Sequence, residues 1–106
     1  MPKFLMEASY TSEGLKGLQK DKGTGRTASV KAAVKSAGGK LDALYWCLGD
    51  ADAILIADFP DNATAAAFGV AVSSTGLVHT KTTVLLTAEE VDAGLDKKIG
   101  YRAPGK

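Results

Sequence analysis

Several residue types that carry chemistry are scarce in this chain. Its 106 residues include one cysteine and one histidine, and 13 basic against 12 acidic residues leave a formal net charge of +1. A single thiol forms no intramolecular disulfide, and one cysteine with one histidine gives no recognisable zinc-ligand spacing. A near-neutral chain has no broad positive field, which argues against nucleic acid or an anionic membrane as a partner.

The chain also lacks a long apolar run. No stretch approaches the roughly 20 apolar residues that a membrane-spanning helix requires. Residues 1–4 do not have the charged-then-apolar layout of a signal peptide. The single cysteine suits a reducing compartment. We therefore expect a cytoplasmic protein with no metal site and no cofactor.

The length and composition are those of one globular domain. Apolar residues make up 45% of the chain and charged residues 24%, which is ordinary for a soluble protein. A chain of 106 residues can bury a single core. We assign residues 1–95 to this domain and expect the charged, glycine- and proline-containing residues 96–106 to form a mobile tail.

The pattern of apolar residues predicts four strands and two helices. Alternation with period two indicates the strands, and apolar residues three and four apart indicate the helices. The hydroxyls of Thr11 and Ser12 can cap the start of the first helix, and Gly38-Gly39 ends it. Asp61 or Asn62 caps the second helix, whose alanines form a face of small residues that lets it lie close on the sheet. The predicted elements are a strand over residues 3–10, a helix interrupted at 23–25, strands over 41–48 and 51–59 joined by a tight turn, a helix from 61 or 62, and a strand over 77–87.

This order of elements predicts an α+β fold. Strand, helix, strand, strand, helix, strand is the split βαβ or ferredoxin-like arrangement, in which two helices cover one face of a four-stranded antiparallel sheet. Residues 88–95 add a short helical turn. A three-layer α/β domain is the weaker alternative, because the hairpin and the small number of elements count against it.

Both faces of the predicted sheet carry apolar residues. Alternation places Leu41 and Tyr45 on one side of the second strand. It places Leu44 and Trp46 on the other side. Two helices can cover only one face, and an uncovered apolar face promotes association. We expect the helix-free face to pack against a second copy, which gives a homodimer or a ring of dimers. The alternative is that residues 88–106 fold back over it.

A set of turn, cap and helix-stop residues runs through the chain from about Phe4 to Thr87. Its members are Tyr10-Thr11, Arg26, Gly38-Gly39, Gly49, Asp52, Pro60-Asp61, Gly76 and Thr80. In this pattern the chain resembles the GYD domain, a ferredoxin-like family related in fold to the dimeric α+β barrels. Gly49 and Asp52 match the family's Gly-x-Tyr-Asp turn, whereas Ala51 stands where the tyrosine is expected.

The resemblance implies a module that has no established activity. The fold group includes ligand-binding modules, cofactor-free monooxygenases and isomerases, so the fold alone does not select a function. We expect an oligomeric small-molecule-binding or regulatory module without proven catalysis. The alternatives are an enzyme resembling the cofactor-free monooxygenases or isomerases of the dimeric α+β barrel group, and an oligomeric scaffold with no ligand.

Candidate ligand-binding residues lie on the predicted strands: Glu7, Trp46, His79 and Lys81. Histidine side chains such as His79 can serve as a general base or a ligand anchor, while Trp46 can stack on a flat ligand. Strand histidines and tryptophans are more often structural or interface residues, and that alternative stays open. We place the site between the sheet and the partner that covers it, because a small-molecule pocket is mostly apolar with a few polar groups.

Two further segments have a structural and a functional interpretation. Lys22-Gly23-Thr24-Gly25-Arg26 allows an anion-binding loop at a helix start, but it lacks the Walker spacing and no strand directly precedes it. We interpret it as a break in the first helix. Asp52 is interpreted as a turn residue that accepts backbone N–H groups, not as an acid catalyst.

Overall fold

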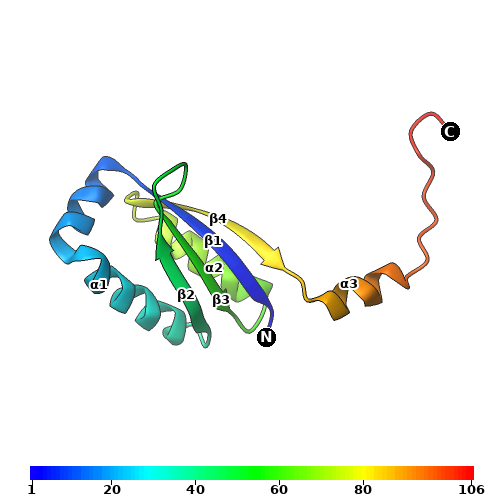
Figure 1. The fold of residues 1–106 in the computed structure, drawn as a ribbon, viewed down its shortest axis with the longest axis horizontal. Helices are drawn as coiled ribbons and strands as arrows, with labels where there is room; N and C mark the ends of the chain where they lie inside the picture. The colour runs from blue at the N-terminus through cyan, green and yellow to red at the C-terminus, as the bar shows by residue number, and fades with distance from the viewer.

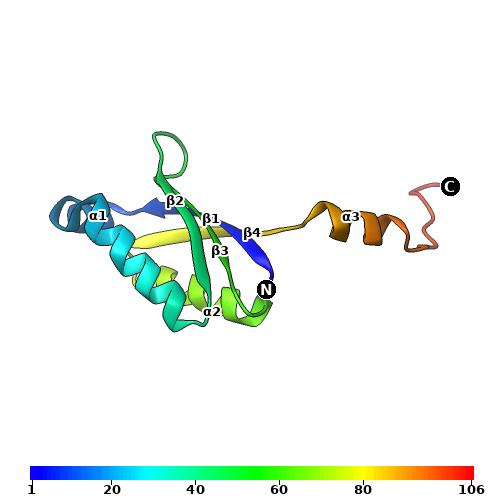
Figure 2. The same cartoon turned by 60° about the horizontal axis from the view of Figure 1, so that its bottom comes forward.

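The computed structural model describes all 106 residues and has an α+β fold with one four-stranded antiparallel sheet and three helices (Figure 1). The elements are β1 (Lys3–Tyr10), α1 (Ser12–Ser36), β2 (Lys40–Trp46), β3 (Ala53–Asp58), α2 (Asn62–Ser73), β4 (Val78–Leu85) and α3 (Ala88–Leu95). The strands lie in the order β2-β3-β1-β4. Figure 2 shows α1 and α2 on the same side of the sheet. The helical turn predicted over residues 88–95 is the third helix, α3.

The first helix begins as predicted and bends where the sequence predicted an interruption. The Thr11 side-chain oxygen accepts a hydrogen bond from the Gly14 backbone N–H (3.2 Å), which caps the helix. The chain continues as a helix across residues 23–25, but Lys22 has φ 67° and ψ 168°. A lysine in this region is strained. The break is therefore a kink at Lys22, directly before the glycines.

The hairpin between β2 and β3 is longer than predicted. Residues 47–52 connect the two strands in place of a tight turn at Gly49-Asp50. The Cys47 N–H donates to the Asp52 carbonyl oxygen (2.8 Å), and the Asp52 N–H donates to the Ala8 carbonyl oxygen of β1 (2.8 Å). The end of the loop is thus tied to β1, and the strands do not continue to the turn.

A bulge in β2 changes which side chains share a face. The register shifts between Leu41 and Ala43, so Asp42 is an extra residue in the strand. The strict alternation that placed Leu41 with Tyr45 is therefore wrong. Leu41 and Leu44 both pack against the core on the helix side of the sheet.

The core lies between the sheet and the helices α1 and α2. Its buried members are Phe4, Met6, Val34, Leu55, Ala57, Phe59, Ala65 and Phe68. The predicted small-residue face of α2 is wrong, because Ala67 and Ala71 are exposed while Phe68 is buried. Burial of a phenylalanine removes far more apolar area from water than burial of an alanine, and the Phe68 ring lies 5.2 Å from the Phe59 ring.

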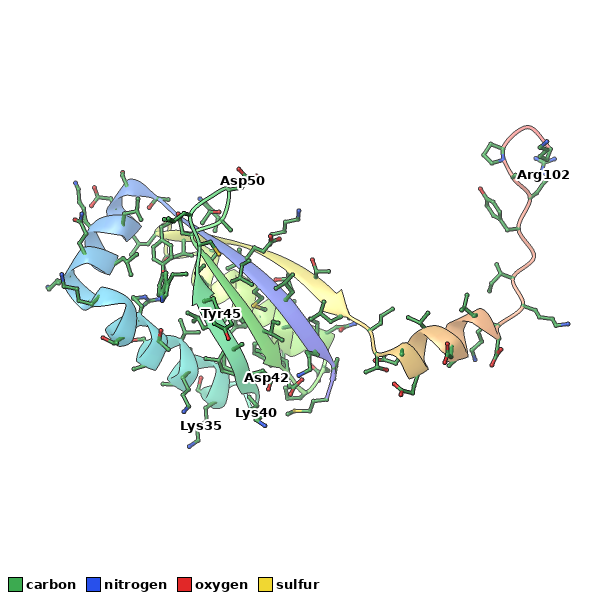
Figure 3. All side chains as sticks on the ribbon, in the orientation of Figure 1. Lys35, Lys40, Asp42, Tyr45, Asp50 and Arg102 are labelled. Carbon is green, nitrogen blue, oxygen red and sulfur yellow. The ribbon has the colours of Figure 1, made fainter.

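The opposite face of the sheet, here called the open face, has no helix over it (Figure 2). Its residues are Lys3, Leu5, Glu7, Ser9, Ala43, Tyr45, Ile54, Ile56, Asp58, His79, Lys81, Thr83 and Leu85. Residues 88–106 do not fold back over it. Instead, α3 and the tail extend away, with Arg102 far from the sheet (Figure 3).

One end of the open face carries an ion-pair cluster. The Lys3 ammonium donates to the carboxylates of Asp42 and Asp58, the latter at 2.9 Å. The hydrogen bond to Asp42, followed by that to Asp58, raises the pKa of Lys3. The hydrogen bond from Lys3 likewise lowers the pKa of Asp42. The bulge thus places Asp42 where it links β2 to β1.

The side chain that caps α2 makes the free energy of unfolding depend on pH in the acid range. The Asp61 carboxylate accepts hydrogen bonds from the Thr64 hydroxyl (2.7 Å) and the Thr64 backbone N–H (2.8 Å), which lower the pKa of Asp61. A pKa lower in the folded state stabilises the fold above the unfolded-state pKa, and this contribution is lost as the pH falls through the folded-state pKa. Asparagine also caps helices but has no charge.

We therefore expect Asp61→Asn to lose less stability than the wild type between about pH 5 and pH 2. Urea denaturation at a series of pH values measures the difference. Asp50→Asn is the control, because Asp50 lies at the tip of the loop after β2 (Figure 3) and caps no helix. Equal acid sensitivity in Asp61→Asn and the wild type would contradict this role of the cap.

Candidate functional site

A large cavity lies on the helix side of the sheet. It has a volume of about 540 Å³ and is lined by residues from β1, α1, α2 and the start of β4. Its walls are mainly apolar, and they include Leu18 from α1, Phe68 and Val72 from α2, and Val78 from β4. A smaller void of about 40 Å³ lies close to the sheet and shares part of this lining, Phe68 and Val72 included. We call the larger space the interhelix cavity.

Small side chains on the two helices keep this cavity empty. Gly17, Ala33 and Ala37 of α1 line it, as do Ala67 and Ala71 of α2. None of these side chains is long enough to reach across the space between the helices. The alanines that the sequence assigned to packing on the sheet therefore form the wall of a cavity instead.

The cavity lining includes a tyrosine and two charged residues, besides the hydroxyl residues Ser36 and Thr75. Tyr10 ends β1, and Asp21 and Arg26 flank the kink in α1. The Arg26 Nε atom is buried and has no hydrogen-bond partner. Arg26 also takes part in none of the ion pairs of the structure. An unpartnered buried donor is rare in folded proteins, because its lost hydration is not replaced.

An aromatic pair supports the kink in α1. The ring centroids of Tyr10 and Trp46 lie 6.0 Å apart. A Cβ atom added to Gly23 would lie 3.2 Å from the Trp46 Nε1 atom, so the backbone of α1 closely approaches the indole there. Trp46 thus fixes the position of the helix segment that carries Arg26.

Three of the four predicted ligand-binding residues come together, on the open face. Glu7 pairs with Lys81 across β1 and β4, and the neighbouring pair contains His79. With Asp50 of the loop these residues line a hollow of about 300 Å³. Trp46 is not among them, because its position opposite Ala53 puts it on the helix side of the sheet.

The predicted turn residue Asp52 accepts a backbone hydrogen bond. Its Oδ2 atom accepts from the Tyr10 N–H at 2.7 Å, so its backbone partner lies on β1 and not within its own turn. The bond fixes the end of β1, from which the Tyr10 side chain reaches the interhelix cavity. Gly49 lies in the same loop with no other group within 4 Å of an added Cβ, so close packing does not require a glycine there.

Sequence reasoning did not place Tyr10 or Arg26 in a ligand site. One signal for Arg26 was present, because the segment Lys22 to Arg26 allowed an anion-binding interpretation. The structure brings the arginine side chain of that segment, and not a phosphate-binding loop, to a cavity wall. The cavity itself depends on how far apart α1 and α2 pack, which no local pattern reports.

None of the three helices combines the length and the apolar character of a membrane span. In comparisons with known proteins, the chain matches no curated protein and no solved structure. Residues 4–95 match the family described as the GYD domain. Because this match covers most of the 106 residues, the protein belongs to the GYD domain family.

Proposed function

We propose that this protein is an oligomeric small-molecule-binding module that holds its ligand in the interhelix cavity. The observation that carries the proposal is the cavity itself, with a volume of about 540 Å³. Ligand pockets typically have volumes of roughly 300–1,000 Å³, with apolar walls and a few polar groups. Phe68, Val72 and Val78 supply the apolar contacts, and Tyr10 and Arg26 supply the polar ones. The proposal assigns no reaction to the site.

The interhelix cavity is a better ligand site than the hollow on the open face. That hollow is smaller, about 300 Å³, and apart from Ala51 its lining is polar. Ligand burial gains most from apolar contact. Glu7, His79 and Lys81 also lie on the face that we assign to a partner subunit, where they act as polar contacts at the rim of the interface.

We also infer that two copies associate through their open faces. Within each subunit, the four strands with α1 and α2 form a ferredoxin-like layout to which α3 is an addition. The proposed dimer is of the α+β barrel type. Leu5, Ile54 and Ile56 are partly exposed and form an apolar centre on this face, over which no helix lies. Uncovered patches of this kind typically serve as protein contacts, and a closed two-fold pair is the commonest assembly.

A neutral fluorescent probe tests the cavity as a binding site. N-phenyl-1-naphthylamine is uncharged and fluoresces more strongly in apolar surroundings. We expect the wild type to bind it and Ala71→Phe to weaken binding at least about tenfold, because the phenyl ring fills the cavity. Ala63→Phe is the matched control, since Ala63 lies on the same helix, is exposed and does not line the cavity.

The same titration can contradict the proposal. Equal probe affinity in Ala71→Phe and Ala63→Phe, with both variants folded by circular dichroism, would place probe binding elsewhere. Absence of binding to the wild type would remove the cavity as a ligand site. Native mass spectrometry of the purified protein then shows whether a cellular ligand is retained.

A further inference from the structure

We propose that the interhelix cavity is selective for apolar organic acids, and that the Arg26 guanidinium binds their anionic group. This inference rests on the proposed function, because it names the ligand class of the same cavity. It adds a charge requirement that a purely apolar pocket does not have. A carboxylate-bearing or sulfonate-bearing small molecule with an apolar body meets that requirement.

Arg26 carries a charge that the protein leaves without a counterion. A guanidinium stays protonated at every physiological pH. Its Nε atom is buried with no acceptor, and no carboxylate lies within ion-pair distance of its nitrogens. Burying a charged donor is costly unless an acceptor replaces the lost water. An anionic ligand supplies this acceptor, and arginine binds carboxylates in a two-pronged geometry.

No buried carboxylate of the protein lies near Arg26 to accept its hydrogen bonds. Arg26 lines both the interhelix cavity and the small void near the sheet. The void is lined otherwise by apolar and aromatic side chains and by Thr80. Asp21 is the one acidic residue that lines the cavity, and it is solvent-exposed and unpaired. The cavity lining therefore contains one partly buried cation, Arg26, and one exposed carboxylate, Asp21, which do not form an ion pair.

The kink in α1 gives an independent reason to assign a role to this segment. Lys22 is the only residue other than glycine with a positive φ, and it directly precedes the turn that carries Arg26. Strained backbone persists where the surrounding structure holds it, and it is concentrated at ligand sites. Here Gly23 packs on Trp46, and the kink sets the direction of the helix that presents Arg26 to the cavity.

The remaining walls fit the apolar body of such a ligand. Phe68 and Val72 of α2 and Val78 of β4 line the cavity together with Arg26. A ligand whose acidic group lies against Arg26 can therefore place its hydrocarbon part under α2. Long or aromatic acids fill this space better than small inorganic anions, which make no apolar contact.

A pair of probes with the same skeleton tests the charge requirement. 8-Anilinonaphthalene-1-sulfonate is N-phenyl-1-naphthylamine with an added sulfonate. We expect the wild type to bind the sulfonate at least about tenfold more tightly than the neutral probe. Arg26→Gln should abolish this preference by weakening sulfonate binding, while affinity for the neutral probe changes less than about twofold. Arg26→Lys should keep part of the preference, because it retains the charge but loses Nε.

Matched variants test whether sulfonate binding depends on Arg26 itself or on the overall charge of this part of the surface. Lys20→Gln removes an exposed cation from the same helix and should leave both affinities unchanged. Asp21→Asn removes the acidic rim and should strengthen sulfonate binding. Competition with decanoate and decanol extends the test to a carboxylate, and decanoate should displace the probe at lower concentration. Arg26→Met serves as a second neutral variant if Arg26→Gln fails to fold.

The outcomes distinguish this inference from the proposed function. If Ala71→Phe blocks both probes but the wild type binds them equally, the cavity is a ligand site without selectivity for acids, and the inference is overturned. Unchanged sulfonate binding in folded Arg26→Gln and Arg26→Met overturns it as well. If Ala71→Phe blocks neither probe, the cavity is not the site and both proposals fail.

Discussion

In the dimer that we propose, replacing Ile56 with aspartate should separate the two subunits. Ile56 lies within the open face, opposite Leu5 of β1 and Ala43 of β2. An aspartate there would bring a charge against the apolar side chains of the partner without a counterion. Two-fold symmetry repeats the defect in both subunits of one interface. We expect the dissociation constant to rise by about a hundredfold or more, as at a central interface residue.

Sedimentation velocity over a range of micromolar concentrations measures this change. Ala32→Asp adds the same charge at an exposed position of α1 and should remain dimeric. Tyr45→Glu provides a second probe, because Tyr45 is 71% exposed and its replacement removes little from the core of the subunit. A wild type that sediments as a monomer, or a folded Ile56→Asp variant that sediments as a dimer, would reject the open face as the interface.

The proposed association also bears on the proposed ligand site, because β1 contributes to both faces of the sheet. Phe4 and Met6 point toward the helices, whereas Leu5 and Glu7 point toward the open face. The two proposals therefore depend on the same strand but use opposite sides of it.

Local patterns predicted the elements whose backbone is governed by nearby residues. Residues 3–10 form β1 with the predicted bounds, because period-two alternation is continuous there. Thr11 and Asp61 cap helices as expected, since a cap requires only its own side chain and an N–H three residues on. Asp52 accepts a backbone N–H, although its partner is Tyr10, far away in the sequence.

The features that local patterns missed depend on contacts between distant segments. The bulge at Asp42 coincides with the ion pair to Lys3, which lies on another strand. The face of α2 is chosen by Phe68, whose ring packs on Phe59. Trp46 was grouped with residues of the open face because the pairing register was unknown, and a shift of one residue moves a side chain to the other face.

The interhelix cavity could not be predicted for a related reason. Alanine-rich helix faces usually pack closely against a neighbouring element. Here the alanines of α1 and α2 line a cavity instead. The distance between α1 and α2 depends on the larger residues Val34 and Phe68, which hold each helix on the sheet. Only the assembled structure shows that the alanines between them have nothing to pack against.

Two glycines one turn apart in α1 should respond in opposite ways to the same substitution. Gly14→Ala should destabilise the fold by about 1–3 kcal/mol, because its Cβ would overlap the Leu77 carbonyl oxygen and crowd the Tyr10 ring at 3.1 Å. Gly17→Ala should stabilise it by up to about 1 kcal/mol, because no group lies within 4 Å of the added methyl and alanine favours a helix.

The clash at Gly14 has no easy relief, because the atom it meets is already fixed. The Leu77 carbonyl oxygen accepts hydrogen bonds from the Thr11 N–H (2.9 Å) and the Thr11 hydroxyl (3.2 Å). Moving α1 away to admit a methyl group would stretch both bonds and displace Tyr10 from the cavity wall. Urea denaturation of the two variants measures whether each substitution lowers or raises the free energy of unfolding. Equal shifts in midpoint would mean that the start of α1 does not lie against β4 as closely as the structure has it, and the shape of the cavity at Tyr10 would then have to differ as well.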